Sequence, residues 1–549
     1  RAMQLDPDNF DIFFNVGIFC LQEKQYMQSI QATQRAIELK PDHAPAWLML
    51  ASAYYETGNS DAVEKLLERL VQKFPDDRSV QVADALFLPS IPRSCEDIDR
   101  SRARFMGKID DLTRRGIGIA DPLMERYNSL FFLAYHGRPH KEMAQRVAQF
   151  FLKSCPELEY TAAHCKKPRK KAGAKIRVGF VSPSMHENTL NQFLLKIIEK
   201  LGEHPAFEVY VFSSAPPLHP NVQSIRKRLS RYVDLPRNLK EAQQVIAREE
   251  MDILLYMEVG SDQLMYCLPF ARLAHMQCVW GGIPVTTGIP NMDHFISNSD
   301  CEPEGAEAHY SERLVMLSRT LSVFSRPNIP EPVMSREALR LPTGDVRLYV
   351  CPVMLHKLHP DMDFAFRDIL TRDPKARILL FDPKLTLAQN VLTRRFAAIM
   401  PPELLSRIVF LPFMTGKDFI HMLRAVDCVL DTFHFSFGTT AYIAIAAEVP
   451  FVTWPGEYYA GRTAWRMFRR MDLPELIAGT HEDFATIAVK LANDRNFYNA
   501  MALRMAERSD QFFDDYAIVD EFADCRPHRL TDMLKGADCR HHDYYLVAD

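Results

Sequence analysis

The chain has 549 residues, 47% of them hydrophobic and 25% charged, with a formal net charge of −4, a composition typical of a globular protein with several domains. The small net charge excludes a global field that would attract nucleic acid or an anionic membrane, and no apolar run reaches the roughly 18 residues of a membrane span. Eleven cysteines are scattered without a CxxC pair or zinc-type spacing, and the first residues resemble no signal peptide, so we expect reduced thiols and a cytoplasmic location.

Residues 1–76 contain a helical repeat. Pro7, Pro41 and Pro75 are spaced by 34 residues, and each is followed by an aspartate. Three further pairs of positions keep this period: Phe13 and Trp47, Gly17 and Ala51, and Cys20 and Tyr54. The pattern resembles the tetratricopeptide repeat, in which two helices approach closely at a small residue and a proline follows the second helix.

The repeat predicts both a partner and an incomplete N-terminus. Residues 1–7 repeat the pattern of residues 35–41, so we expect the chain to be truncated inside the last helix of an earlier repeat. Stacked repeats expose a concave surface that binds peptides or proteins. We therefore expect a protein partner along the repeats; the alternative is that these helices only brace the next domain.

Two further segments lead to the second half of the chain. Residues 77–165 keep helical periodicity but lose the 34-residue pattern, which predicts a divergent helical segment. Residues 166–174 form a basic run with Pro and Gly, which is typical of a solvated linker and less typical of a nucleic-acid or targeting segment.

From residue 175 onward, short apolar strands alternate with helical stretches, which predicts two doubly wound parallel sheets. We expect lobes at 175–335 and 336–531 and a tail at 532–549. The strands expected in the first lobe are 176–182, 209–212 and 253–256, and those in the second are 347–350, 378–381, 408–411, 428–431 and 451–454. Ligands of such sheets bind beyond the carboxyl ends of the strands.

One loop between a strand and a helix has the composition of an anion site. Residues 431–438 end at Gly438, and Thr439 and Thr440 follow at the expected start of a helix, whose free N–H groups and dipole favour a phosphate. The alternative is that a threonine merely caps the helix. Arg462 follows the next strand, and Lys357 follows the strand at 347–350, from where its charge could stabilise a departing diphosphate.

Several motifs in order resemble the O-linked N-acetylglucosamine transferases, and one of them is similar to the bacterial branch of that family. The matching segments are 271–278, 284–290, 292–297, 302–314, 431–440 and 455–457 with Arg462. The resemblance implies tetratricopeptide repeats followed by two Rossmann-like lobes of GT-B type, the first on the acceptor side and the second binding the nucleotide sugar. It implies inverting transfer of a sugar from UDP-GlcNAc or UDP-Glc to a protein side chain, with Ser or Thr favoured.

The resemblance also assigns site residues. Lys357 matches the lysine that contacts the diphosphate, and Thr439 and Thr440 match the phosphate-binding pair. Phe419 is placed to stack on the base, and Gln277, Thr286 and Thr287 fall in the segment that faces the sugar and the acceptor. No metal is required by the family's chemistry. We interpret Asp361 and Asp363, which follow Pro360, as acids that favour a helix dipole rather than as a metal-binding pair.

Three positions depart from the family pattern. Asn188 stands where the family has a histidine that reaches donor and acceptor, with His186 two residues away as a possible substitute. Ile283 replaces a His or Tyr, and Ile443 replaces the acid that holds the ribose. Asn cannot act as a general base, and Ile cannot accept a hydrogen bond. Two hypotheses follow: an active protein glycosyltransferase, or a catalytically weakened relative that acts as a protein-binding module.

Overall fold

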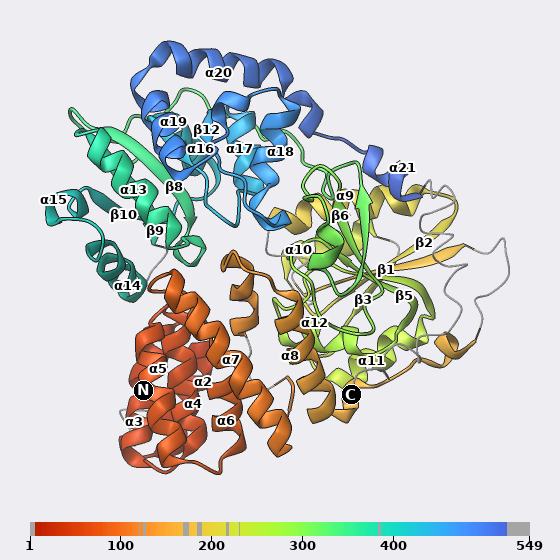
Figure 1. Ribbon diagram of the computed structural model, residues 1–549. Coiled ribbons are helices and arrows are strands. Elements are labelled where there is room, and N and C mark those ends of the chain that lie inside the picture. The colour runs from red at the N-terminus through yellow and green to blue at the C-terminus, as the bar shows by residue number, and fades with distance from the viewer. Residues whose placement is uncertain are drawn as a thin grey trace. The chain divides into compact units, whose positions relative to one another are not determined.

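The structure is a computed structural model that describes residues 6–119, 121–123, 128–167, 175–183, 189–215, 219–229, 231–382 and 386–523 (Figure 1). The chain forms two compact units. Unit 1 contains residues 1–138 and 328–508, and unit 2 contains residues 139–327 together with the described residues from 509 onward.

The repeat helices form two hairpins in unit 1. Their bounds are α2 Phe10–Gln22, α3 Tyr26–Leu39, α4 Ala44–Glu56 and α5 Ser60–Lys73, so each helix of the second hairpin begins 34 residues after its counterpart. A Cβ on Gly17 would lie 2.6 Å from Thr33 Oγ1 and 2.8 Å from Met49 Cε, so only glycine permits this close approach of the helices. The predicted tetratricopeptide hairpins are therefore confirmed.

The divergent helical segment is shared between the units. Helices α6 Arg78–Ala85 and α7 Cys95–Arg115 and the 3₁₀ turn η1 Asn128–Tyr135 belong to unit 1, whereas α8 Lys141–Ser154 belongs to unit 2. Arg395 Nη1 donates to the carbonyl of Pro92 at 3.0 Å, and Arg394 pairs with Asp61 at 2.7 Å. These contacts attach the repeat helices to the lobe in the same unit.

The lobe of unit 1 contains a five-stranded parallel sheet in the order β10-β9-β8-β11-β12. The strands are β8 Arg347–Met354, β9 Ala376–Asp382, β10 Ile408–Pro412, β11 Cys428–Leu430 and β12 Phe451–Val452. The helices are α13 Asp361–Arg372, α14 Thr386–Ala397, α15 Pro402–Leu405, α16 Gly416–Ala425, α17 Thr439–Ala446, α18 Thr463–Arg470, α19 His481–Asn493 and α20 Arg495–Arg508. The central strands are continuously apolar because helices cover both faces of a parallel sheet.

Unit 2 contains a seven-stranded parallel sheet in the order β3-β2-β1-β4-β5-β6-β7. The strands are β1 Ile176–Ser182, β2 Phe207–Ser213, β3 Tyr232–Asp234, β4 Met251–Tyr256, β5 Ala274–Trp280, β6 His294–Asn298 and β7 Arg313–Leu317. Its helices besides α8 are α9 Thr189–Glu203, α10 Pro220–Arg228, α11 Leu239–Arg248, α12 Gln263–Cys267 and α21 Ala517–Ala523. The predicted fold class, repeat helices followed by two doubly wound lobes, is confirmed.

The chain returns to the first lobe at its C-terminal end. Helix α21 buries Ile518, Val519 and Phe522 in the core of unit 2, and the rings of Phe522 and Trp280 lie 5.3 Å apart. The sequence pattern assigned the whole stretch 336–531 to the second lobe, whereas residues 509–523 pack on the first. The apolar face of an amphipathic helix can be recognised from its sequence, but the sequence does not reveal which surface that face packs against.

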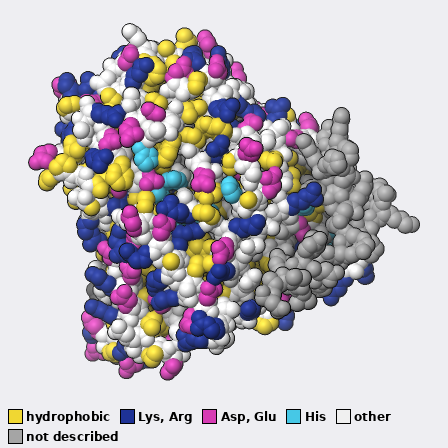
Figure 2. All heavy atoms as spheres, viewed as in Figure 1, with side chains coloured by type: hydrophobic (Ala, Val, Ile, Leu, Met, Phe, Trp, Pro, Cys, Tyr) yellow, Lys and Arg dark blue, Asp and Glu magenta, His cyan; other side chains and the backbone are white. Residues whose placement is uncertain are grey.

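The distribution of charge on the surface and the character of the helices agree with what the composition indicated. Basic and acidic side chains are interspersed over the described part of the face in Figure 2. Among the described residues, no helix combines the length and the apolar character that a membrane crossing requires. The linker residues 168–174 and the tail 532–549 lie outside the described residues.

Candidate active site in the second lobe

The carboxyl ends of β8 and β11 meet because the two strands are adjacent and parallel, with Val350 paired to Val429. Strand β8 continues into the 3₁₀ turn η6 Leu355–Lys357, and β11 continues into the loop 431–438 that leads to α17. Lys357 Nζ lies 4.8 Å from the centre of the Phe435 ring in that loop. It also lies 6.0 Å from the ring of Tyr135, at the end of η1.

Lys357 is a partly buried cation. Burial lowers its pKa from 10.5 to about 8, against an opposing effect of the Asp431 carboxylate. Within the described parts of the chain, its ammonium contacts aromatic faces but has no hydrogen-bond or ion-pair partner. An ammonium in such surroundings gains strongly from an anionic ligand.

Asp431 organises the loop that Lys357 faces. This fully buried carboxylate accepts hydrogen bonds from Ser436 Oγ at 2.6 Å, the Phe437 amide at 2.7 Å, Thr453 Oγ1 at 2.7 Å and the Thr432 amide at 2.8 Å. Burial raises its pKa to about 6 despite these bonds. In the sequence, Asp431 marks only the end of an expected strand. The signal that could have revealed its structural role is the position of an acid directly after a buried strand.

Helix α17 begins without a side-chain cap. The N-cap residue is Gly438, which has no side chain that could accept a hydrogen bond from the first amides of the helix. Thr439 and Thr440 are the first two residues of the helix itself, so neither serves as the cap. Gly438 is exposed, and a Cβ built on it would have no neighbour within 4 Å. Both threonines are half-buried, and neither hydroxyl has a partner among the described residues. The first turn therefore offers amide and hydroxyl donors.

The loop after β12 is held against the loop after β11. Ser436 N donates to the carbonyl of Ala460 at 2.8 Å, and Gly456 N donates to that of Gly461 at 3.0 Å. A Cβ on Gly461 would lie 2.9 Å from Gly456 Cα, so this close approach requires glycine. Arg462 Nη1 donates to the Gly456 carbonyl at 3.1 Å, and its guanidinium stacks 4.1 Å from the ring centre of Trp465. Arg462 thus stabilises the loop.

Two other residues of the second lobe bear on the nucleotide. Phe419 is half-buried on α16, which packs against α17. Ile443 is half-buried on α17, and its side chain has no hydrogen-bonding group at the position where the family pattern has an acid. Phe419 and the two threonines are thus carried by neighbouring helices.

The acid pair at the start of α13 has separate partners. Asp363 is buried and accepts two hydrogen bonds of 2.7 Å from Arg395, and burial raises the pKa of Asp363 to about 6. Asp361 instead contacts His359, His434 and Cys95. The two carboxylates are therefore engaged with different partners.

Three residues expected to face the sugar and the acceptor have structural contacts in unit 2. Gln277 is fully buried on β5; its amide donates to the carbonyls of Ala271 at 3.0 Å and Asn291 at 2.9 Å and accepts from the Leu273 amide at 2.9 Å. These bonds hold the segments before and after β5.

Thr286 and Thr287 are buried beside a carboxylate that sequence reasoning missed. Thr286 Oγ1 donates to Glu312 Oε2 at 2.6 Å, and the Thr287 amide donates to Glu312 Oε1 at 2.8 Å. Thr287 Oγ1 also donates to Glu312. Their described contacts hold the loop 284–290. The expected catalytic positions His186 and Asn188 lie outside the described residues.

Comparison with known proteins identifies the family. The model of Glycosyl transferase family 41 matches residues 122–330 and 325–517. This chain belongs to glycosyltransferase family 41. A tetratricopeptide-repeat model matches residues 20–85, in agreement with the two hairpins.

Plant proteins are similar to more than half of this chain. The probable UDP-N-acetylglucosamine–peptide N-acetylglucosaminyltransferase SPINDLY of Solanum lycopersicum is 23% identical over 347 residues, 60% of this chain and 36% of the tomato protein. The probable enzyme SEC of Arabidopsis thaliana, described by the same activity, is 24% identical over 369 residues, 63% of this chain and 36% of the relative. The chain thus spans about a third of the length of these family members.

A solved structure extends the similarity to the whole fold. The O-GlcNAc transferase of Thermobaculum terrenum superposes with a TM-score of 0.69 at 22% identity, over 94% of this chain and 96% of the bacterial one. The chain therefore shares the fold of that protein, repeat helices followed by two lobes of GT-B type.

Proposed function

We propose that the chain transfers a sugar from a UDP-sugar to a protein side chain, with Ser or Thr as acceptor and inversion at the anomeric carbon. Membership of family 41 supports glycosyl transfer, and the names of the plant relatives specify UDP-N-acetylglucosamine as donor and a peptide as acceptor. UDP-GlcNAc or UDP-Glc is the proposed donor. The repeat helices would bind the acceptor protein along their concave surface.

The observation that carries the proposal is the ammonium of Lys357, which has no hydrogen-bond or ion-pair partner among the described residues and faces the loop that leads to the donor-rich start of α17. Negative charge grows on the diphosphate as its bond to the sugar breaks. The Lys357 ammonium would neutralise that charge, while the first amides of α17 and the hydroxyls of Thr439 and Thr440 would donate hydrogen bonds to the phosphates. The open space at Gly438 would let the phosphates approach the backbone.

Supporting residues would orient the nucleotide. Asp431 keeps the loop 431–438 in place through its four hydrogen bonds, and Arg462 holds the next loop against it. Phe419 on α16 would stack on the uracil ring. These residues would hold the nucleotide sugar in place, and the charged and hydrogen-bonding groups of the chain would stabilise the leaving diphosphate.

Calorimetric titration with UDP tests the donor site. We expect one UDP per chain and at least a tenfold loss of affinity in Lys357→Ala, because a charge-assisted contact to an anion is lost. Lys375→Ala is the matched control, since the Lys375 ammonium pairs with Asp345 at 2.6 Å on the surface. If the folded protein binds none of UDP, GDP and CMP, the transferase proposal fails.

A second candidate function is a protein-binding module without transfer, and Ile443 is the observation that favours it. An apolar side chain at this position removes a hydrogen bond to the ribose, worth roughly 1 kcal/mol. A transfer assay with UDP-GlcNAc and UDP-Glc on a peptide library, read by mass spectrometry, separates the two functions. Glycosylated peptides whose anomeric linkage is inverted support the enzyme; UDP binding without any product from either donor supports the module.

A further inference from the structure

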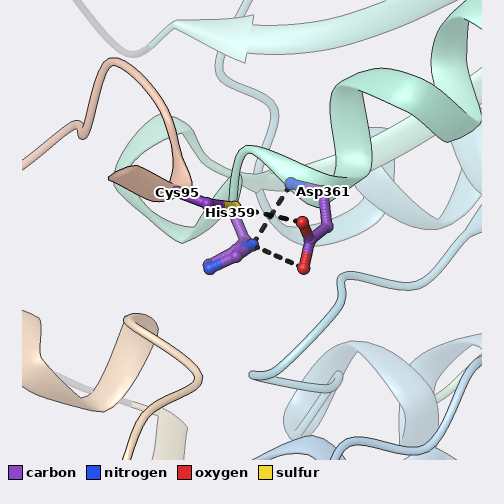
Figure 3. A group of neighbouring side chains, drawn as sticks. All are labelled: Cys95, His359 and Asp361. Carbon is purple, nitrogen blue, oxygen red and sulfur yellow. Dashed lines mark hydrogen bonds and ion pairs between the residues drawn. The ribbon is translucent and has the colours of Figure 1, made fainter. Parts of the chain in front are cut away.

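Four metal-ligating side chains meet on unit 1 at a place that the proposed transfer reaction does not use. Cys95 is the first residue of α7, and His359 and Asp361 flank Pro360 at the start of α13. His434 lies in the loop 431–438. Figure 3 shows the side chains of Cys95, His359 and Asp361 directed toward one another. Among the described residues, no other group of three His, Cys, Asp or Glu side chains converges in this way.

The distances among Cys95, His359 and Asp361 are close to those of a metal site, and His434 contacts one of these ligands. Asp361 Oδ1 lies 3.1 Å from Cys95 Sγ, and Asp361 Oδ2 lies 3.2 Å from His359 Nδ1 and 2.7 Å from His434 Nε2. The ligand atoms of Cys95, His359 and Asp361 all lie within 4.8 Å of one another. A tetrahedral zinc ion separates its ligand atoms by about 3.3–3.8 Å. The separations of the three ligand atoms of Cys95, His359 and Asp361 thus bracket those around a tetrahedral ion.

The hydrogen bonds of His359 prepare its Nδ1 atom as a ligand. His359 Nε2 lies 3.3 Å from the carbonyl oxygen of His136. A carbonyl can only accept, so Nε2 carries the hydrogen and Nδ1 keeps its lone pair. Histidines that bind metals in proteins usually donate their other N–H to a carbonyl or carboxylate in this way. The Asp361 amide donates to Nδ1 at 3.2 Å, and a metal ion on Nδ1 would replace this hydrogen bond because the nitrogen has a single lone pair.

The lone pair of His359 Nδ1 faces a carboxylate oxygen. Nδ1 and Asp361 Oδ2 lie 3.2 Å apart, and two acceptors at this distance repel unless a metal cation or a proton lies between them. His434 approaches the same oxygen, and its ring centre lies 4.2 Å from that of His359. A Cβ on Gly137 would lie 2.5 Å from His434 Cγ, so the backbone at Gly137 closely confines the His434 ring. The His434 ring is thus held in place by packing.

We propose that Cys95, His359, Asp361 and His434 bind one zinc-class divalent ion. A thiolate, two imidazoles and a carboxylate are a donor set that zinc prefers over magnesium or calcium. The ion would join α7 to the start of α13 and to the loop 431–438, whose far end begins α17. It would stabilise this junction and take no part in sugar transfer. The proposal does not depend on the donor or acceptor proposed above.

Cobalt substitution of the full chain tests the site. The untagged protein is stripped with a chelator and titrated with Co²⁺, which reports tetrahedral coordination through intense visible bands and a bound thiolate through a charge-transfer band in the near ultraviolet. We expect one Co²⁺ per chain, displaced by one Zn²⁺ measured by mass spectrometry. Saturating Zn²⁺ should also raise the unfolding temperature, because a ligand that binds only the folded state stabilises it.

Matched variants locate the ion. Cys95→Ser should abolish the charge-transfer band and weaken binding at least tenfold, and His359→Ala should abolish binding. Cys20→Ser, at a buried cysteine of the repeats, should change neither. A variant with Cys539→Ser, His541→Ala and His542→Ala removes a thiol and two imidazoles that lie close together in the C-terminal sequence and should retain the ion.

Three outcomes overturn the proposal. The first is that the stripped protein, shown to be folded by circular dichroism and a cooperative thermal transition, takes up no Co²⁺ or Zn²⁺; His359 and Asp361 then share a proton. The second is that binding persists in both Cys95→Ser and His359→Ala. The third is that binding disappears in the variant of residues 539–542, which would place the ion in the tail.

Discussion

Replacing Lys357 by methionine should stabilise the fold while it removes donor binding. Methionine is similar in length but carries no charge, so it fills the same space against Phe435 and Tyr135 without the cost of a buried ammonium. The fall in the pKa of Lys357 from 10.5 to about 8 corresponds to roughly 3 kcal/mol. After allowance for partial exposure of the side chain, we expect a gain of about 2 kcal/mol at pH 7.

The gain should depend on pH in a defined direction. Below pH 8 the lysine is charged in both the folded and the unfolded chain, so the full cost of burial is present. Between pH 8 and 10.5 the folded protein has released the proton and the unfolded chain still holds it, so the stability of the wild type rises with pH. At pH 10 the advantage of Lys357→Met should fall to about a quarter of its value at pH 7.

Thermal unfolding without nucleotide measures this effect. At roughly 2–4 °C per kcal/mol for a domain of this size, the midpoint of Lys357→Met should exceed that of the wild type by about 4–8 °C at pH 7. Lys375→Met is the control, because that lysine is exposed and paired with Asp345. A lower midpoint for Lys357→Met at pH 7, or an equal gain at pH 7 and 10, would refute the assignment of a costly buried charge.

Three further predictions follow from the same contacts. UDP affinity, measured by calorimetric titration, should fall as the pH rises above 8, because Lys357 then loses its proton. The variant Lys357→Arg stays charged and should remove this pH dependence. A wild-type affinity that stays constant up to about pH 10 would contradict this prediction. Asp431→Ala removes the acceptor of four buried hydrogen bonds. The substitution should lower the free energy of unfolding by roughly 3 kcal/mol and abolish UDP binding. An unchanged unfolding midpoint would show that the loop does not need the carboxylate. Phe522→Ala should lower the stability of unit 2 by about 3–5 kcal/mol in denaturant unfolding with UDP affinity unchanged; a loss confined to unit 1 would place α21 elsewhere.

Local patterns predicted most of the fold. The 34-residue period anticipated both hairpins because each repeat helix is defined by contacts within and between neighbouring hairpins, and Gly17 marks the place where helices approach. The expected strand at 176–182 coincides with β1, and the other expected strands agree within a few residues with those observed. Buried parallel strands are short apolar runs, so their position is visible without tertiary information.

The candidate site was predictable only in part. Lys357, Thr439 and Thr440 lie at one edge of the sheet because adjacent parallel strands bring their carboxyl ends together. Gln277, Thr286 and Thr287 were expected to face a ligand, and the partners that the structure shows for their polar groups are backbone groups and Glu312. An amide or hydroxyl has the same character in the sequence whether its partner is a ligand or a buried group of the chain.

The sequence by itself determined the repeats, the two alternating α/β lobes and the ordered motifs of the family, because each depends on residues near one another in the chain. Only the tertiary structure decided that α21 packs on unit 2, that Asp431 organises its loop, and that Cys95 contacts Asp361. Cys95 and Asp361 are 266 residues apart, and no local pattern records such a meeting. The packing of helices and loops brought them together, and that packing depends on the whole apolar core rather than on any single segment.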